Sequence, residues 1–283
     1  MCAADADAAD LMLLSRRIDE LKAVRPLRSL VLPEALLPLQ QLQLSLNAET
    51  AICREFYDSG EPIGIFGAGL SHGVEAHVAE VNKEFNDSGF GDPMLCTATI
   101  VAGRIIQRVE APEIGPLAGD WLECEVRLID LGLSDQLMAA MTPSRVVQLA
   151  ARELGPLVSQ WLDLARGGGT DLHGQPRQPR SSGAPSSGAP SSPEADGAAV
   201  SKMLAELGEL PAVDRPSERA LWVGALINPA GVASSQWPAM DLREHLLTAT
   251  TPLERLSVAK TGLIDSIYKL KGGSWPLRTY YWQ

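Results

Sequence analysis

A glycine-rich stretch at residues 62–73 comes nearest to a known ligand-binding motif. It reads PIGIFGAGLSHG, an apolar run followed by closely spaced glycines. A strand, a glycine-rich turn and a helix N-terminus in that order bind the pyrophosphate of a dinucleotide. That fingerprint also needs a second strand ending in an acidic residue about 20 residues further on, whereas residues 85–92 read as a loop. We therefore favour a glycine-rich connection between strands, with nucleotide binding by the loop between Gly67 and Gly73 as an alternative.

Histidines and cysteines give no metal-ligand pattern. His72 and His77 lie at the start of a predicted helix with Glu75 and Glu80 nearby. Five residues apart on a helix they point about 140° apart, and the HExxH pattern is absent, so we predict surface histidines and no metal. The four cysteines form no CxxC pair and are predicted to be small buried residues in a reducing compartment: Cys2, Cys53, Cys96 and Cys124.

Carboxylates on one predicted strand raise the question of acid–base catalysis. Glu123, Glu125 and Asp130 lie on or just after it, and paired carboxylates can exchange protons with a substrate. Glu123 and Glu125 alternate with apolar residues, which is typical of a solvated sheet face. G-x-x-x-x-G-K-[ST] does not occur in the chain, and G-x-S-x-G occurs once, at residues 69–73, inside the glycine-rich stretch for which we favour a connection between strands. We therefore predict no catalytic residue and no cofactor.

Aromatic residues are the candidate contacts for a partner. They make up only 5% of the chain, and sparse aromatics near a β surface tend to anchor interfaces. Tyr57, Phe66 and Trp121 are the candidate polypeptide-binding residues, and a place in the core is the alternative for each. Residues 275–282 read WPLRTYYW, which could contact a partner or pack on the chain's own domain.

The net charge of −11 is unevenly distributed. Residues 28–132 contain 6 basic and 16 acidic residues, whereas residues 201–271 contain 8 of each. An acidic surface repels phosphate backbones, which argues against nucleic-acid binding. No window approaches the length of a membrane span, and the first ten residues lack the basic residues of a targeting signal. We expect a soluble, cytoplasmic protein, or an organellar one if a presequence is missing.

The first half of the chain is predicted to be mostly β. Leucine and isoleucine at helical spacing predict an N-terminal amphipathic helix that ends before Pro26. Residues 48–59 and the segment around Val74 and Val78 are also predicted helices. Alternating or continuous apolar runs predict extended segments at residues 29–32, 36–46, 62–66, 95–109 and 121–131. A bulge would explain the shift in alternation at Gln40 and Gln41.

The second half is predicted to be helical. Thr142 and Pro143 begin a helix that ends near residue 166. Residues 170–197 are rich in Gly, Pro, Ser and Ala with a repeated SSGAP, which predicts a disordered linker. Helices then follow at 199–207, 216–227, from Asp241 and at 252–271. Capping boxes are predicted at Thr251 with Glu254, and at Asp241 with Glu244.

Three stretches together resemble the Lon substrate-binding domain, the N-terminal domain of Lon-type ATP-dependent proteases. Residues 30–39 (LVLPEALLPL) resemble its opening strands, and residues 51–66 resemble its first helix and the strand that follows. Residues 220–227 (ALWVGALI), with the later helices and Glu254-Arg255-Leu256, resemble its helical half.

The resemblance implies a PUA-like β-barrel followed by a helical bundle, and a role in holding unfolded or tagged polypeptide. The chain departs from the family pattern at Pro33-Glu34, where the family has Pro-Gly. It also departs at residues 45–49, which replace an aromatic-Glu-Pro-Arg-Tyr turn. The AAA+ and Ser-Lys protease modules of Lon have no counterpart here, so the resemblance implies no proteolysis.

We therefore predict an α+β protein with five parts. They are an N-terminal helix (1–26), a PUA-like β-barrel (27–132), a connecting helix (133–167), a disordered linker (168–198) and a helical bundle with an aromatic tail (199–283). The predicted function is non-enzymatic binding of unfolded or tagged polypeptide, or of a protein partner, as an adaptor or in protein quality control. The alternatives are a nucleotide-binding oxidoreductase and an RNA-binding PUA-like protein.

Overall fold

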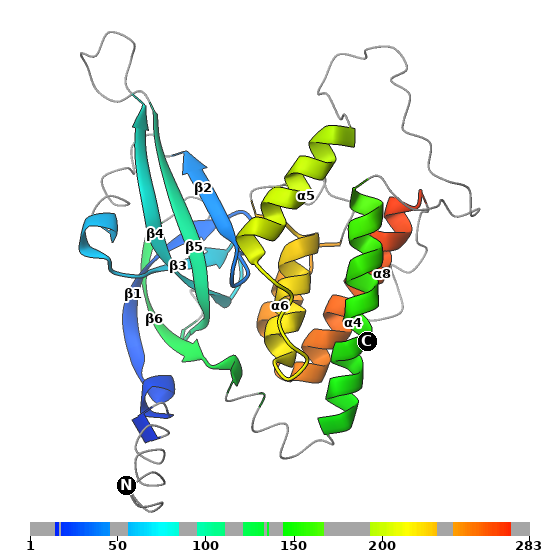
Figure 1. Cartoon of the computed structure of the whole chain (residues 1–283). Helices are drawn as coiled ribbons and strands as arrows, with labels where there is room; N and C mark the ends of the chain where they lie inside the picture. Colours follow the sequence, from blue (N-terminus) through cyan, green and yellow to red (C-terminus); the bar gives the residue numbers. More distant parts are fainter. Residues whose placement is uncertain are drawn as a thin grey trace, which may run out of the picture. The chain divides into compact units, whose positions relative to one another are not determined.

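The computed structural model divides the chain into two compact units, Met1–Leu131 and Gly132–Gln283 (Figure 1). The first unit is built of strands and the second of helices, which confirms the predicted α+β class. The structure describes residues 15–16, 18–45, 56–84, 95–110, 121–132, 135, 144–166, 193–230 and 240–272. Several predicted features lie outside these residues: the first turns of the N-terminal helix, most of the helix at 48–59, the Thr142 cap, most of the linker and the aromatic tail.

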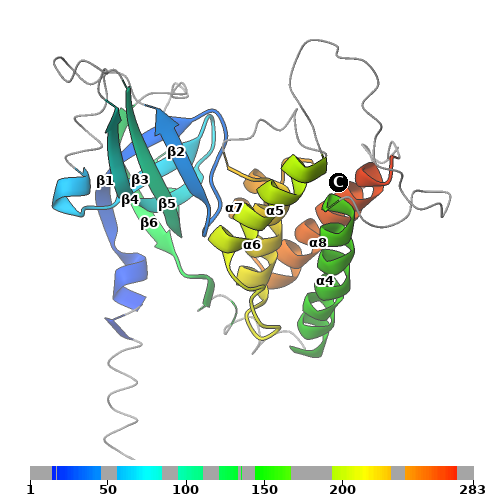
Figure 2. The same ribbon diagram turned by 45° about the horizontal axis from the view of Figure 1, so that its top comes forward.

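Strands β1 to β6 of the first unit form a closed barrel with one extra strand. Their bounds are Val24–Leu32, Gln41–Ser45, Ile63–Gly67, His72–Glu84, Leu95–Arg108 and Trp121–Ile129. They are ordered β2-β5-β4-β3-β1-β6, and β5 also pairs with β6. That additional pairing closes β5, β4, β3, β1 and β6 into a barrel and leaves β2 paired with β5 alone (Figure 2). Barrel closure removes sheet edges, so β2 alone among the described strands is left outside the closed ring.

The predicted helix around Val74 and Val78 is wrong, because this segment forms β4. A spacing of four residues suits one face of a helix, but four is also a multiple of two and therefore suits one face of a strand. Val74, Ala76 and Val78 are buried, whereas His77 between them is exposed. His72 and His77 consequently lie on a strand, where an odd spacing places them on opposite faces.

Phe66 forms the centre of the barrel interior. It is fully buried and clusters with Leu27, Ile106 and Val126. The neighbouring β3 and β4 backbones approach it closely at two glycines. A Cβ on Gly73 would lie 2.2 Å from the Ile65 carbonyl oxygen and 2.6 Å from the Phe66 ring. Packing around Phe66 therefore accounts for Gly73 without any bound ligand.

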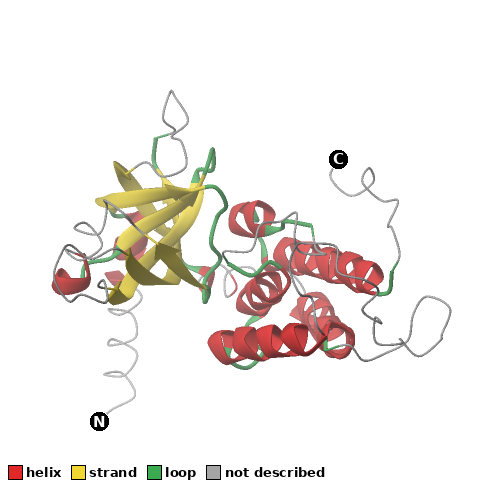
Figure 3. Ribbon diagram, turned by 90° about the horizontal axis from the view of Figure 1, so that it is seen from above, coloured by secondary structure: helices red, strands yellow, loops and turns green. Residues whose placement is uncertain are grey.

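The helical unit is arranged around α6. Helices α4 to α8 span Ser144–Ala165, Pro193–Leu207, Pro216–Ile227, Arg243–Thr248 and Pro252–Leu270 (Figure 3). Every residue of α6 except Glu218 is buried, as expected of a helix that is apolar on all sides. Accordingly α6 contacts α4, α5, α7 and α8.

Helix α4 belongs to this bundle and is not a connection outside it. The Trp161 indole Nε1 donates to the Ser266 hydroxyl of α8 at 2.8 Å, and the Arg219 Nε of α6 donates to the Ala151 carbonyl of α4 at 2.8 Å. Residues 167–192 therefore join two helices of one unit, and the predicted linker between barrel and bundle is misplaced. Helix α5 also begins at Pro193, inside the predicted linker. Composition carries no information about which helices pack together.

The predicted N-cap of α8 is confirmed for the Thr251 hydroxyl, but Glu254 bonds to the Thr250 amide instead of the predicted Thr251 amide, and the cap of α7 departs from the prediction. The Thr251 hydroxyl accepts from the Glu254 amide at 3.2 Å, and the Glu254 carboxylate accepts from the Thr250 amide at 2.9 Å. The capping box predicted at Asp241 is wrong. Its carboxylate accepts from the Arg243 amide two residues on, at 3.0 Å, and the N-cap residue of α7 makes no side-chain bond.

The N-terminus of α6 is capped by a residue far away in the chain. The Asp135 carboxylate accepts from the Ser217 amide at 3.1 Å and also from the Ser217 hydroxyl. Arg255 donates to the same hydroxyl at 3.1 Å. Burial raises the pKa of Asp135 above its usual value, although the bonds from Ser217 oppose this shift. These contacts stabilise α6 where its own N-cap side chain makes no bond.

Candidate functional site

One edge of β2 pairs with no other strand among the described residues; we call it the free edge of β2, and it is the main candidate for a binding site. The strand reads QLQLS and contains no charged residue. Leu42 is buried, whereas Gln41 and Gln43 are exposed. Among the described strands only β5 pairs with it. Natural edge strands are commonly protected by charges or proline, and the five residues of β2 carry neither.

The pairing with β5 determines which main-chain groups of β2 face outward. The Ala102 amide donates to the Gln40 carbonyl at 2.8 Å, and Gln41 lies opposite Val101. In an antiparallel pair, bonded residues alternate with residues whose N–H and C=O point away from the partner. Gln41 and Gln43 therefore direct their amide and carbonyl groups toward the free edge.

A strained turn immediately precedes this edge. The Gln40 amide donates to the Leu37 carbonyl at 3.2 Å, and Leu39 has φ 75°. With Pro38 in the second position, this is a type II turn, in which the third position usually requires glycine. Leu39 and Gln40 together lie opposite Ala102, since the Leu39 amide donates to its carbonyl at 3.1 Å. This is a bulge with its first residue in the left-handed region, one residue before the predicted position.

Leu39 has an unusual combination of backbone and side-chain environments. A left-handed conformation costs a non-glycine residue roughly 1–2 kcal/mol. The Leu39 side chain is nevertheless 42% exposed, while the preceding Leu36 and Leu37 are buried. Backbone strain of this kind often occurs at binding sites. We call Leu39, Gln41 and Gln43 the β2 edge site.

The three aromatic residues predicted from the sequence have three different environments. Phe66 is 0% exposed, so its prediction as a surface contact is wrong, because it fills the barrel. Trp121 is half-buried and stacks on Phe56, with centroids 6.1 Å apart and planes at 8°. Tyr57 follows on the same helical turn and is 47% exposed. The Arg28 guanidinium lies 5.9 Å from the Phe56 ring centroid, so Arg28, Phe56 and Trp121 form one cluster.

The glycine-rich stretch is a β-hairpin. Strands β3 and β4 are antiparallel, with Phe66 opposite Gly73, and Gly69 at the turn has φ 77°. No helix begins after these glycines, because β4 follows directly. A dinucleotide fingerprint needs the helix N-terminus to bind pyrophosphate. The alternative prediction of a nucleotide site between Gly67 and Gly73 is therefore wrong, because this loop lacks the helix that such a site requires.

A buried carboxylate lies on the inward face of the barrel. Glu75 is paired by Arg104, whose Nη2 is 2.7 Å from Oε2, and by the Arg25 Nη2 at Oε1. Burial raises the pKa of the Glu75 carboxyl, but hydrogen bonds and charges from Arg25 and Arg104 outweigh burial and hold it below its usual value. A carboxylate kept ionised by two guanidiniums is a poor proton donor, so this arrangement favours stability over catalysis.

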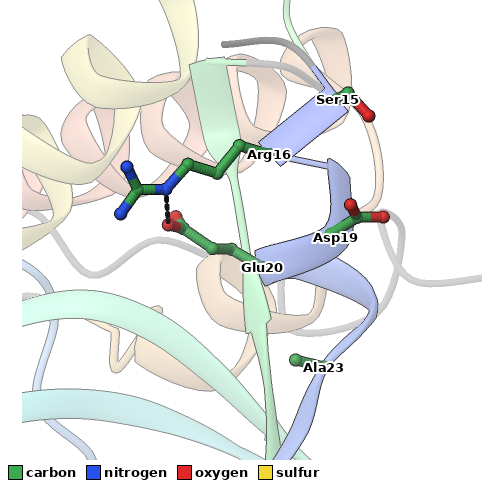
Figure 4. Close-up of a pocket in the computed structure, with 5 residues that line it drawn as sticks. All are labelled: Ser15, Arg16, Asp19, Glu20 and Ala23. Atoms are coloured by element: carbon green, nitrogen blue, oxygen red, sulfur yellow. Dashed lines mark ion pairs between the residues drawn. The ribbon is translucent and has the colours of Figure 1, made fainter. Parts of the chain in front are cut away.

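The open hollow beside the N-terminal helix offers no charged or polar group that would hold a ligand firmly. It is lined by Ser15, Arg16, Asp19, Glu20 and Ala23 (Figure 4). Its ion pair joins Arg16 Nε and Glu20 Oε1 at 3.4 Å, and both side chains are largely exposed, so the pair contributes little. Within the described residues, no group of three or more His, Cys, Asp or Glu side chains is placed to hold a metal ion. None of the described helices has the length and hydropathy to span a membrane.

Solved structures similar to this chain include two Lon N-terminal domains. No protein-family model and no curated protein matches the chain. The Lon N-terminal domain protein from Xanthomonas campestris is 15% identical, with 41% of this chain and 73% of that chain covered and a TM-score of 0.26. The N-terminal domain of Mycobacterium avium complex Lon protease is 17% identical, with 85% and 99% covered and a TM-score of 0.38. Both TM-scores are low, so we base the fold on strand pairing and helix contacts alone.

Sequence reasoning missed the β2 edge site. The alternation of β2 was visible, but an edge strand and a central strand share that pattern. Whether a strand has one partner or two depends on pairings distant in sequence, such as that of β5 with β6. The local signal for the strained turn is Pro38 in the second turn position followed by Leu39, where a type II turn usually has glycine.

Proposed function

We propose that this chain is a non-enzymatic polypeptide-binding module of the Lon N-terminal type. The free edge of β2, with the outward amide and carbonyl groups of Gln41 and Gln43, is the observation that carries the proposal. An extended polypeptide added along such an edge gains main-chain hydrogen bonds that do not depend on its sequence. This mode suits a ligand recognised because it is unfolded. The resemblance of residues 30–39, 51–66 and 220–227 to the Lon substrate-binding domain supports the same function.

Leu39 supplies an apolar contact at the start of the edge. Its side chain is 42% exposed and its backbone conformation is fixed by the turn. A ligand strand presents alternate side chains to each face, so one apolar ligand residue can cover Leu39 while the main chain pairs with β2. The excess of acidic residues in 28–132 favours ligands with lysine or arginine. In this proposal the protein acts as an adaptor or quality-control factor.

A proline substitution tests the edge itself. In Gln43→Pro the outward amide is lost and the ring blocks an incoming strand, while the bonds between β2 and β5 remain, because the residue 43 amide does not face β5. Gln43→Ala removes the side chain and keeps the amide. We expect the proline variant to bind a fluorescent, permanently unfolded polypeptide about tenfold more weakly, and the alanine variant to bind like wild type in anisotropy titrations. Equal affinity in all three proteins would refute binding at this edge.

A matched pair of truncations tests the apolar contact. Leu39 and Val109 are both 42% exposed and lie in the same unit. Leu39→Ala should weaken binding about fivefold, the equivalent of roughly 1 kcal/mol of apolar burial, whereas Val109→Ala should not change it. If the two variants weaken binding equally, Leu39 has no special role.

A further inference from the structure

The barrel interior contains a buried cation without an anionic partner among the described residues. Arg108 is 6% exposed. It lies on β5, two residues after Ile106, and therefore on the inward face with Phe66. The Arg108 Nε and Nη2 atoms are both buried and have no hydrogen-bond partner. A buried donor without an acceptor costs about 1–3 kcal/mol, and more when it is charged.

The two unpartnered atoms lie on one edge of the guanidinium. Arg108 Cζ is 4.2 Å from the centroid of the Phe66 ring, so the aromatic ring covers the face of the group. Nε–H and Nη2–H point in the same direction from the edge and form a fork. A fork of two parallel N–H donors matches the two oxygens of a carboxylate or a phosphate. The contact with Phe66 therefore fixes the orientation of the cation but leaves these two donors unbonded.

Among the described residues, the ion pairs on the neighbouring strands leave no carboxylate for Arg108. Arg25 lies opposite Val126 on one side of β6, and Arg108 lies opposite the same residue on the other side. Arg25 and Arg104 share one carboxylate, that of Glu75, and the Arg25 Nε is also buried without a partner. Burial lowers the pKa of Arg108, yet an arginine starts so far above neutrality that it stays charged. Glu75 is thus shared by Arg25 and Arg104, and no described ion pair joins it to Arg108.

We propose that the barrel interior binds a small oxyanion, a carboxylate or a phosphate, on the Nε and Nη2 edge of Arg108. The anion accepts both hydrogen bonds and offsets the excess positive charge. This site is separate from the β2 edge site, because it faces inward from β5 and β6. A negative result for polypeptide binding therefore does not contradict anion binding, and a negative result for anion binding does not contradict polypeptide binding.

Nitrogen-15 NMR of the arginine Nε–H groups in the full chain tests this proposal. Acetate and inorganic phosphate are titrated separately at constant ionic strength, with chloride as the balancing anion. We expect one Nε–H resonance to shift saturably, and the Arg108→Lys variant to lack that resonance. A response to acetate alone identifies a carboxylate site, and a response to phosphate alone identifies a phosphate site. Arg108→Lys keeps the charge without the fork and should bind about tenfold more weakly by thermal-shift titration.

Arg127→Met is the matched control, because Arg127 is an exposed residue on the outer face of β6. It should retain wild-type binding of the anion. Arg108→Met should abolish binding, and if this variant does not fold, the wild-type titration with the Arg108→Lys assignment still decides. An Arg108 resonance that responds to neither anion, or only linearly as chloride does, would overturn the proposal.

Discussion

Replacing Glu75 by glutamine tests whether the interior of the barrel is stabilised by charge. The carboxylate is 4% exposed and accepts from Arg104 Nε at 2.8 Å, from Arg104 Nη2 at 2.7 Å and from Arg25. Glutamine has nearly the same shape but no charge, and its amide nitrogen cannot accept a bond. Glu75→Gln therefore removes the ion pairs while preserving the packing.

The expected cost follows from the exposure of the partners. Removing one partner of a fully buried pair costs about 3–5 kcal/mol, because the other charge is left buried. Here the Arg25 and Arg104 side chains are 35% and 61% exposed, so water can solvate both guanidiniums in the variant. We therefore expect Glu75→Gln to lower the free energy of unfolding of the barrel by about 2 kcal/mol at neutral pH.

The pH dependence of this difference has a defined sign. The pKa of folded Glu75 lies below its usual value of 4.5. A carboxyl whose folded pKa is depressed contributes stability above its unfolded pKa and loses it as the pH falls through the folded pKa. The stability difference between wild type and Glu75→Gln should therefore be constant near neutrality and should disappear in acid.

This difference can be measured by urea unfolding at several pH values. Hydrogen exchange of peptides from β4 and β5 serves as the readout, so that the unfolding of the barrel alone is observed. Glu80→Gln is the control, because Glu80 is an exposed residue on the same strand. Wild-type stability in Glu75→Gln at neutral pH would refute the reasoning. So would a difference that persists unchanged in acid.

Three substitutions test the helical unit in urea unfolding experiments that use the circular dichroism signal of the helices as the readout. Trp161→Phe should cost about 1–2 kcal/mol, because the buried Ser266 hydroxyl loses its donor. Gly262→Ala should destabilise by about 1–2 kcal/mol despite better helix propensity, since its Cβ would lie 2.1 Å from Leu242 Cδ1. Thr251→Ala should cost about 1 kcal/mol through loss of the α8 cap. A Gly262→Ala variant more stable than wild type would contradict the close packing of α8, and unchanged midpoints in the other two would contradict the contacts named.

Local signals in the sequence predicted much of the helical unit. The bounds of α6 follow from Pro216 at its start and from the continuous apolar run at residues 220–227. At α8, Thr251 and Pro252 determine the first turn, and the left-handed Gly272 follows the last. These signals act within a few residues and do not depend on the rest of the fold.

Features that depend on distant residues were not predictable in this way. Val74 and Val78 satisfy the periods of both a helix and a strand, and only pairing with β3 and β5 decides between them. The cap of α6 by Asp135 joins residues 82 positions apart. The partner strand of β2 and the charge environment of Arg108 likewise arise from the closed barrel, so the sequence pattern revealed neither site.

Residue-resolved hydrogen exchange of β2 tests polypeptide binding most directly. The amides of Gln41 and Gln43 face the free edge, whereas those of Leu42 and Leu44 already face β5. With saturating unfolded polypeptide, we expect exchange to slow at Gln41 and Gln43 and to remain unchanged at Leu42 and Leu44. Bound polypeptide that leaves the Gln41 and Gln43 amides unprotected would contradict the proposed function of this edge.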